Sequence, residues 1–389
     1  MTQWIKNNLK GDPVIWGIAL LLSILSILAV YSATSFLAYR QMKGNTEYYL
    51  IKHASLMMAS LVAMWVVHQI DYRYYAGIAR IGLWISVPLL LITWRYGLKL
   101  NEASRWLTIP VINKAFQPSD LAQLALIVRV ASILARHQQN IQDFKQALVP
   151  ILVWCGVICG LIALTNLSGA LLLFLTCMLL MFFGRIPIKY LAMLSVTGLV
   201  AGSLAMGIGQ RGATALNRIK SFRQRELPFQ IEQAYIAIAT GGVYGKGPGK
   251  STQRNFLPHP YSDFIYAILV EEYGLVGGIA VMLLYLVLLY RGFRNVATRN
   301  RIYGGLLSAG LSFALVLQAT VNMGVAVGLG PVTGLPLPFV SMGGTSLLFT
   351  GISLGIILSV SRGEIDQSID WITQQNGQPK LRNTYRTLA

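Results

Sequence analysis

The chain has 389 residues, of which 54% are hydrophobic and 12% are charged, and its formal net charge is +18. Soluble domains carry about 25% charged residues, so this composition excludes an ordinary soluble domain. The positive charge is spread over many polar segments between apolar runs, which argues against a nucleic-acid-binding surface. Attraction to membrane lipids with anionic headgroups accounts for part of it.

Apolar runs of the length that crosses a bilayer as a helix recur along the whole chain. The sequence therefore predicts an all-α, polytopic membrane protein with about ten transmembrane helices, which form one domain over residues 1–362. The polar tail 363–389 is expected to be disordered. The predicted spans are 14–35, 50–68, 79–97, 119–137, 148–165, 168–184, 188–209, 263–290, 304–328 and 340–361.

The distribution of Lys and Arg sets the expected orientation. In the shorter polar segments these residues favour the side that also carries both termini, which predicts cytoplasmic termini. The one long segment, 210–262, then becomes a large extracytoplasmic loop. It is rich in Lys and Arg. A basic external loop runs against the usual bias, and a polyanionic ligand would explain it.

The most informative stretch is 241–274, in which a glycine-rich basic loop runs into an apolar helix. Asp263 stands at that junction, and Glu271 and Glu272 follow inside the apolar run. Carboxylates at the edge of a hydrophobic span are costly and usually mark function. Two structural alternatives stay open: Asp263 as a helix cap, and the glutamates as bonds to neighbouring helices.

Two polar motifs precede this stretch. Arg105 and Trp106 follow the third span, where they are either an interfacial anchor or a phosphate-binding pair, because a guanidinium matches phosphate oxygens. Asp120 enters the fourth span after Gln117, Pro118 and Ser119, a pattern typical of a helix start. Asp120 could also orient that helix or bind a cation at the outer face.

A third motif runs from Asn322 to Ser346 and contains three prolines and several glycines. Such a segment cannot form a continuous helix. Broken backbone at membrane depth is tolerated where it is buried in protein or lines a cavity. The segment is therefore either one wall of a polar outer cavity or a re-entrant turn without catalytic duty.

These motifs in this order resemble the SEDS (shape, elongation, division and sporulation) family of lipid-linked peptidoglycan glycan polymerases. The resemblance covers nearly all ten spans, and it is closer to the division members than to the elongation members. No single piece is decisive, but the ordered set is specific. Its pieces are Gly11-Asp12, Ala29 to Ala33, Arg105-Trp106, Gln117 to Ser119, Gln230, Gln233, Gly241-Gly242, Gly245 to Gly247, Asp263 to Ile265, Glu271-Glu272 and 331–346.

The chain departs from the family pattern at a few positions. Asn166 stands where the family carries an acidic residue, and Gln123 stands where a lysine is common. Asp120 replaces the usual glutamate and keeps the charge. These changes make positions 166 and 123 poor candidates for essential chemistry, and they leave Asp263 untouched.

The resemblance implies a glycosyltransferase that uses lipid II, the undecaprenyl-pyrophosphate-linked precursor, with Asp263 as the catalytic base. A leaving pyrophosphate needs cations rather than an acid, so one carboxylate and a basic cradle should suffice. No cofactor is certain, although Mg²⁺ or Mn²⁺ could share the cradle's task. The residues expected on the substrate side are Arg105, Arg218, Lys246, Gln233 and Lys250, and those expected in support are Asp120, Glu271, Glu272, Trp106 and Ser341.

The same resemblance implies a bacterial inner-membrane location at the division septum, with a class B penicillin-binding protein and other division proteins as partners. The alternatives are a lipid II flippase or an elongation polymerase. A carrier would distribute ionisable residues across membrane depth. Arg129, inside the fourth span, is the one feature that favours a polar path deeper in the membrane, as a carrier would need.

Overall fold

The computed structural model describes residues 9–41, 46–100, 103–109, 114–138, 148–208, 212–224, 228–257, 260–294 and 302–375. Helices occupy all ten positions predicted to cross the membrane, which confirms the all-α polytopic class. They are α2 (Pro13–Gln41), α3 (Thr46–Gln69), α4 (Tyr75–Tyr96), α5 (Pro118–Arg136), α6 (Val149–Thr165), α7 (Leu167–Phe183), α8 (Ile188–Ile208), α11 (Ile265–Arg294), α12 (Ile302–Ala326) and α13 (Thr345–Gln375).

Within the described residues, seven helices are long and apolar enough to cross a membrane, judged by length and composition alone. Helices α6 and α7 are shorter apolar helices beside them. Many large apolar side chains of the long helices are exposed on the outside of the bundle, among them Leu21, Met58, Trp84 and Leu283. An apolar exterior of this extent is stable against lipid and not against water.

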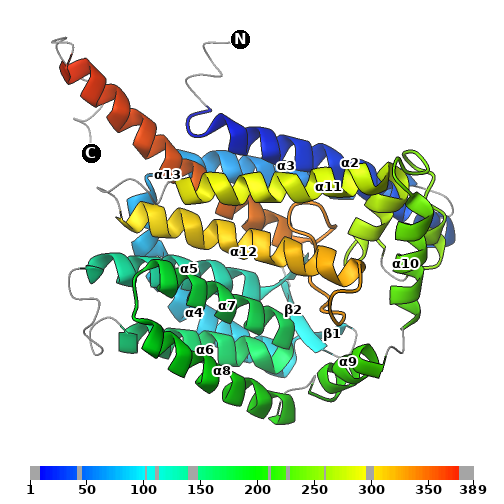
Figure 1. Cartoon of the computed structure of the whole chain (residues 1–389), viewed down its shortest axis with the longest axis horizontal. Helices are drawn as coiled ribbons and strands as arrows, with labels where there is room; N and C mark the ends of the chain where they lie inside the picture. Colours follow the sequence, from blue (N-terminus) through cyan, green and yellow to red (C-terminus); the bar gives the residue numbers. More distant parts are fainter. Residues whose placement is uncertain are drawn as a thin grey trace.

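The bundle has two distinct ends. Helix α2 begins beside α13, where the backbone N–H of Asp12 donates to Ser361 Oγ at 3.0 Å. At the opposite end lie α9 (Gly212–Gln224) and α10 (Phe229–Gly241), as Figure 1 shows. The predicted loop 210–262 is thus partly helical, and it also contains the short helix η4 (Gln253–Asn255).

Small residues let the helices approach closely. Helix α13 packs along α3, α4 along α5, and α11 along α12. A Cβ at Gly355 would stand 2.7 Å from the carbonyl oxygen of Met64, and one at Gly351 would overlap Ser60. Because apolar lipid provides little driving force for helix association, such close backbone packing holds membrane bundles together.

The segment between α4 and α5 differs from the expected loop. It forms a three-stranded antiparallel sheet of β1 (Leu98–Leu100), β2 (Ala103–Ile109) and β3 (Lys114–Phe116). Strand β2 contains tryptophan, threonine and isoleucine, which favour strands. The sheet also pairs backbone polar groups that would otherwise meet an apolar surface unsatisfied.

Two boundaries near the C-terminus also differ from the prediction. The final membrane helix begins at Thr345 rather than at 340, because the preceding segment carries the prolines. Helix α13 continues to Gln375, so it includes the start of the predicted disordered tail. Residues 376–389 lie outside the described residues.

Candidate active site

Asp263 lies in the turn that leads into α11, at the end of the bundle that carries α9 and α10. Its half-buried carboxylate accepts a hydrogen bond from Ser262 Oγ at 2.9 Å. Among the described residues, no helix N–H donates to this carboxylate. The structure therefore does not support a role for Asp263 as a helix cap alone.

Two other elements hold the Asp263 turn in place. Asn322 Nδ2, near the end of α12, donates to the Asp263 carbonyl at 2.9 Å and to the Leu335 carbonyl at 2.8 Å. Ser341 Oγ donates to the Ser262 carbonyl at 2.6 Å and accepts from Leu337 N–H at 2.8 Å. Hydrogen bonds from buried groups on separate elements limit the positions that the turn can take.

The segment between α12 and α13, residues 327–344, is buried in the protein at 335 and 337–341, whereas Val327 and Leu329 at its start are exposed. Phe339 is 1% exposed and has a φ of +63°, a left-handed conformation that an aromatic residue rarely adopts. Its neighbours are held by Tyr285 Oη, which donates to the Pro338 carbonyl, and by Ser26 Oγ, which donates to Val340 at 2.7 Å. The strained segment is therefore fixed from both α11 and α2.

Arg218, on α9, lies within electrostatic reach of Asp263. Its Nη1 donates to the Val332 carbonyl at 2.9 Å. Burial lowers the pKa of Arg218, and the negative charge of Asp263 acts in the opposite direction. Burial also raises the pKa of Tyr261, and electrostatic interactions with Tyr49 and Asp263 raise it further. A carboxylate, a guanidinium and a phenol thus lie within electrostatic reach of one another.

A cavity of about 540 Å³ adjoins Arg218 between α9, α10 and the segment 327–344. Arg223 and Tyr235 also line it, together with apolar groups such as Ile231 and Val332. Its wall combines cations with apolar surface, which suits a ligand that is anionic and partly apolar.

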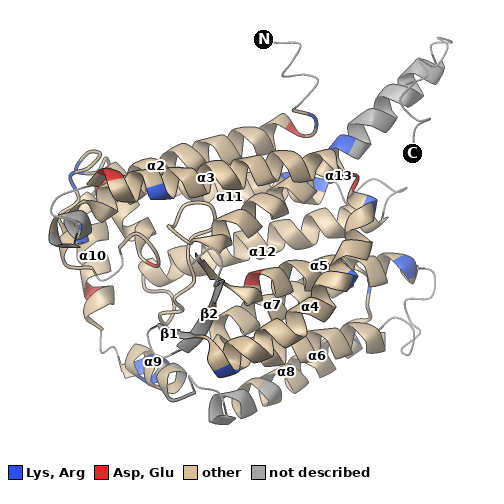
Figure 2. Ribbon diagram, turned by 180° about the vertical axis from the view of Figure 1, so that it is seen from behind, with Lys and Arg blue, Asp and Glu red and all other residues tan. Residues whose placement is uncertain are grey.

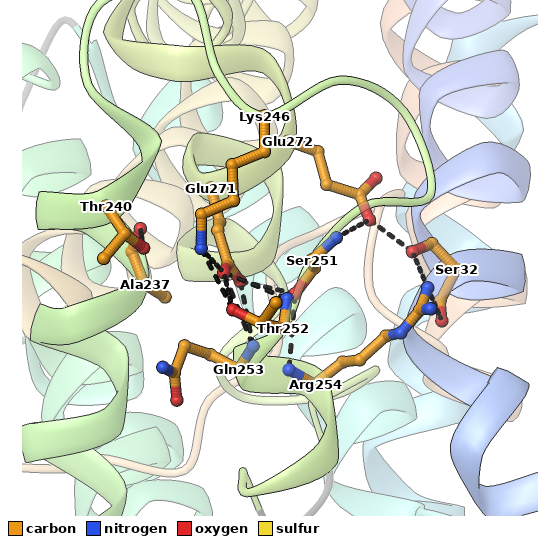
Figure 3. A network of polar contacts seen from close by, with 10 residues as sticks. All are labelled: Ser32, Ala237, Thr240, Lys246, Ser251, Thr252, Gln253, Arg254, Glu271 and Glu272. Atoms are coloured by element: carbon orange, nitrogen blue, oxygen red, sulfur yellow. Dashed lines mark hydrogen bonds and ion pairs between the residues drawn. The ribbon is translucent and has the colours of Figure 1, made fainter.

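Glu271 and Glu272 are fully buried in α11, and the structure gives each of them hydrogen-bond donors (Figure 3). Glu271 accepts from Lys246 Nζ at 2.6 Å, from the Thr252 N–H at 3.0 Å and from Ser251 Oγ. Buried charges need partners of this kind.

Glu272 fastens the same loop to a different helix. It accepts from the Ser251 N–H at 3.3 Å and from Ser32 Oγ of α2. Arg254 Nη1 donates to Ser32 Oγ at 3.0 Å (Figure 3). It also donates to the Gly249 carbonyl at 2.9 Å. Loop 245–254, α2 and α11 therefore form one connected polar network, which assigns a structural role to both glutamates.

The other residues predicted on the substrate side lie in different surroundings. Lys246 is engaged by Glu271 and Thr252, so its charge is already balanced. Lys250 is exposed in the same loop, and Gln233 is half-buried on α10. Arg105 belongs to strand β2, but its side chain lies outside the described part of the structure. Of the four whose side chains the structure describes, Arg218 is the one that lies within electrostatic reach of Asp263.

Of the supporting residues, Trp106 lies beside the segment 327–344 and Asp120 lies in the first turn of α5. Trp106 is near Gly344, where an added Cβ would stand 3.8 Å from the indole ring. Asp120 Oδ1 accepts from Gln117 Nε2 at 2.9 Å, whereas its Oδ2 is buried and has no partner among the described residues. The Gln117 N–H donates to Thr345 Oγ1 at 3.2 Å and links this helix start to α13.

The sequence analysis missed several residues of this arrangement. Ser32, Ser251 and Arg254 carry the network of Glu272, and no spacing in the sequence relates them. Asn322 stood in a motif that was singled out for its broken backbone and not for its amide. Among the described residues, no group of three His, Cys, Asp or Glu side chains could hold a metal ion.

The fold and the site define a multi-span membrane protein with one carboxylate and a basic cavity at one edge of its bundle. Residues 12–365 match the family model described as cell cycle protein, FtsW/RodA/SpoVE. The chain therefore belongs to the FtsW/RodA/SpoVE family, which confirms the predicted SEDS membership.

Relatives with known names cover nearly the whole chain. The probable peptidoglycan glycosyltransferase FtsW of Geobacter metallireducens is 34% identical over 367 residues, 92% of this chain and 97% of that protein. The stage V sporulation protein E of Bacillus subtilis is 32% identical over 365 residues, 90% of this chain and 97% of that protein. Several further relatives carry the FtsW name, which supports the division-type assignment.

Solved structures share the fold. The crystal structure of the rod shape determining protein RodA of Thermus thermophilus is 25% identical, with a TM-score of 0.67 over 92% of this chain and 98% of that one. A chain from a peptidoglycan synthase complex has a TM-score of 0.71 at 24% identity, over 91% and 98% of the two chains. This second likeness shows the fold alone.

Proposed function

We propose that this protein is a peptidoglycan glycosyltransferase that polymerises lipid II at the outer face of the bacterial inner membrane. One observation carries the proposal: hydrogen bonds from Ser341 and Asn322 hold the turn of Asp263 within electrostatic reach of Arg218, at the edge of a bundle whose relatives bear that enzyme name. Transfer from a lipid pyrophosphate needs a proton acceptor and a cation in the same site.

In the proposed reaction, a sugar hydroxyl of one chain attacks the anomeric carbon of another. The new C–O bond forms as the bond from that carbon to the pyrophosphate oxygen breaks, with inversion at the carbon. The hydroxyl proton passes to the Asp263 carboxylate. The pyrophosphate leaves as an anion, and Arg218 stabilises its charge from the cavity side. No general acid is needed because the leaving group is already a stable anion.

A divalent cation, Mg²⁺ or Mn²⁺, fits this scheme as an addition. Mg²⁺ is commonly held by one or two carboxylates together with substrate phosphates. Asp263 and Asp120 both lie toward the cavity end of the bundle, and Asp120 Oδ2 lacks a protein partner among the described residues. When bound, the ion would neutralise charge on the leaving pyrophosphate.

The cellular role that follows is septal wall synthesis, with both termini in the cytoplasm and the α9–α10 end outside. Cross-linking of the glycan is the task of a separate transpeptidase in this proposal. A class B penicillin-binding protein is the partner of matching chemistry, alongside other membrane proteins of the division machinery.

The test is polymerisation by the purified protein. Wild-type protein incubated with lipid II should yield glycan chains, resolved by gel electrophoresis. Asp263→Asn keeps the shape but loses the proton acceptor, so the rate should fall about 100-fold or more. Glu232→Gln removes an exposed carboxylate of α10 and should leave the rate unchanged.

Unchanged synthesis by Asp263→Asn would reject the assignment of the base. Absence of any polymerisation by wild-type protein, together with movement of labelled lipid II across vesicle membranes, would favour the flippase instead. Gel filtration and thermal unfolding of Asp263→Asn show whether a lost rate reflects lost folding.

A further inference from the structure

Three arginines gather between α4 and α5, at the end of the bundle opposite Asp263. Arg129 lies within α5, Arg136 is the last residue of that helix, and Arg80 is near the start of α4. The charges of Arg80 and Arg136 both reach the guanidinium of Arg129. Figure 2 shows basic residues at this end as well as at the α9–α10 end. The proposed reaction uses none of these three side chains.

Helix geometry explains why they meet. Gly82 of α4 packs on Ala125 of α5, because an added Cβ would stand 3.4 Å from the Ala125 methyl group. Positions 129 and 136 follow Ala125 by one and three helical turns, so all three share one face of α5. Because α4 and α5 run antiparallel, residues before Gly82 lie level with residues after Ala125. Position 80 lies about 160° around α4 from Gly82, so Arg80 approaches Arg129 from the exposed side of α4, near enough for its charge to act on Arg129.

The cluster lacks a balancing acid in the described part of the chain. Arg129 Nη1 is buried and has no hydrogen-bond partner there. The described ion pairs are Lys246–Glu271 and Arg291–Asp12, neither of which involves the cluster. Asp71 lies at the same end of the bundle, but its carboxylate accepts from the Arg73 N–H at 3.0 Å. An enclosed donor on a cation without a partner is costly, so an anion from outside the chain would stabilise this site.

The surroundings indicate which anion. Next to Arg80, the outward face of α4 carries Ile78, Ile81 and Trp84, whose exposed fractions are 55%, 64% and 66%. Arg80 and Arg136 are themselves exposed, whereas Arg129 lies about 10 Å further along α5, by the helical rise. Cations beside apolar surface match a molecule with an anionic head and alkyl chains. A guanidinium can bind phosphate oxygens through two parallel hydrogen bonds.

We infer that Arg80, Arg129 and Arg136 form a binding site for the phosphate headgroup of an anionic glycerophospholipid, in the leaflet opposite the Asp263 edge. Arg129 supplies the enclosed donor, and the two exposed arginines close around the headgroup. The acyl chains lie along the apolar face of α4. The site binds a structural lipid and does not depend on the proposed polymerase reaction.

The experiment measures lipid binding by the full-length protein in nanodiscs of phosphatidylcholine, to which phosphatidylglycerol is added in steps. Bound phosphatidylglycerol is counted by native mass spectrometry after release, and the midpoint of thermal unfolding is followed in parallel. Arg129→Gln removes the enclosed donor. Arg95→Gln is the control, because Arg95 is an exposed arginine near the end of α4, the helix that carries Arg80 close to its start.

Wild type and Arg95→Gln should each retain one bound phosphatidylglycerol. Arg129→Gln should bind this lipid about tenfold more weakly, because it loses one charged hydrogen bond. Phosphatidylglycerol should raise the unfolding midpoint of wild type and should not raise that of Arg129→Gln. Arg129→Lys, which keeps the charge without the planar fork, should lie between them.

Equal binding by wild type and Arg129→Gln would overturn the inference. Retention of phosphatidylcholine, whose headgroup has no net charge, as strong as that of phosphatidylglycerol would also overturn the inference. So would stabilisation by inorganic phosphate alone, because that result would define a free-anion site rather than a lipid site. Unfolding midpoints in phosphatidylcholine alone show whether Arg129→Gln folds.

Discussion

Lys246 Nζ lies 2.6 Å from Glu271 Oε1, and Glu271 is fully buried whereas the Lys246 side chain is 27% exposed. This pair joins the glycine-rich loop to α11, and Thr252 completes it by bonding to both side chains. A lysine that the sequence suggested for binding substrate therefore balances the charge of a buried carboxylate. The pair leads to the first prediction.

Replacing Lys246 with methionine should lower the stability of the protein. The change keeps the length of the side chain but leaves Glu271 without its cation, at a cost of about 1–3 kcal/mol in the free energy of unfolding. The midpoint of thermal unfolding in detergent measures it. The double variant Lys246→Met, Glu271→Gln should lose less stability than the two single variants lose in sum. Additive losses would show that the two residues act independently.

Gly245 leaves no room for a side chain. Its φ is +81°, and an added Cβ would overlap the carbonyl of Glu272. Gly249 has a similar φ of +73°, but nothing lies within 4 Å of its Cβ position.

We expect Gly245→Ala to displace the loop from α11 and to abolish cooperative unfolding or lower its midpoint strongly. Gly249→Ala should cost only about 1–2 kcal/mol, the strain of a left-handed alanine. Limited proteolysis within loop 245–254 reports the displacement directly. Equal effects of the two variants would show that backbone strain, and not close packing, governs this loop.

Arg218→Gln should weaken use of a pyrophosphate-linked donor. Because this guanidinium lies beside Asp263 and the cavity, its loss should lower kcat/KM for lipid II about tenfold or more. Lys220→Gln, which removes an exposed charge from the same helix, is the matched control and should have little effect. Steady-state rates over a range of lipid II concentrations measure both. Wild-type kcat/KM in Arg218→Gln would remove Arg218 from the proposed mechanism.

The orientation of the bundle decides where the reaction takes place. Tyr244 is 86% exposed in the loop near α10, and Tyr74 is 69% exposed at the opposite end. In a background without Cys155, Cys159 and Cys177, Tyr244→Cys should react with a membrane-impermeant thiol reagent on intact spheroplasts. Tyr74→Cys should react only after lysis. The reverse labelling pattern would place Asp263 in the cytoplasm and would exclude external polymerisation.

Much of the fold could be predicted because membrane helices have a local signature. A helix that crosses lipid satisfies its own backbone and must be apolar over about 20 residues, so each span can be recognised from its own sequence. The ten predicted positions are all helical for this reason. The small sheet of β1, β2 and β3 was missed because its short strands carry no comparable signal and depend on pairing with each other.

The sequence by itself determined the membrane class, the family resemblance and the prominence of Asp263 at a span edge. Only the tertiary structure decided which charges meet. Ser32 reaches Glu272 across 240 positions, and Asn322 reaches the Asp263 carbonyl across 59. The tertiary structure also separated Lys246, which is paired with Glu271, from Arg218, which lies within electrostatic reach of Asp263. Electrostatic interactions depend on distance in space and on burial, and neither quantity follows from the order of residues along the chain.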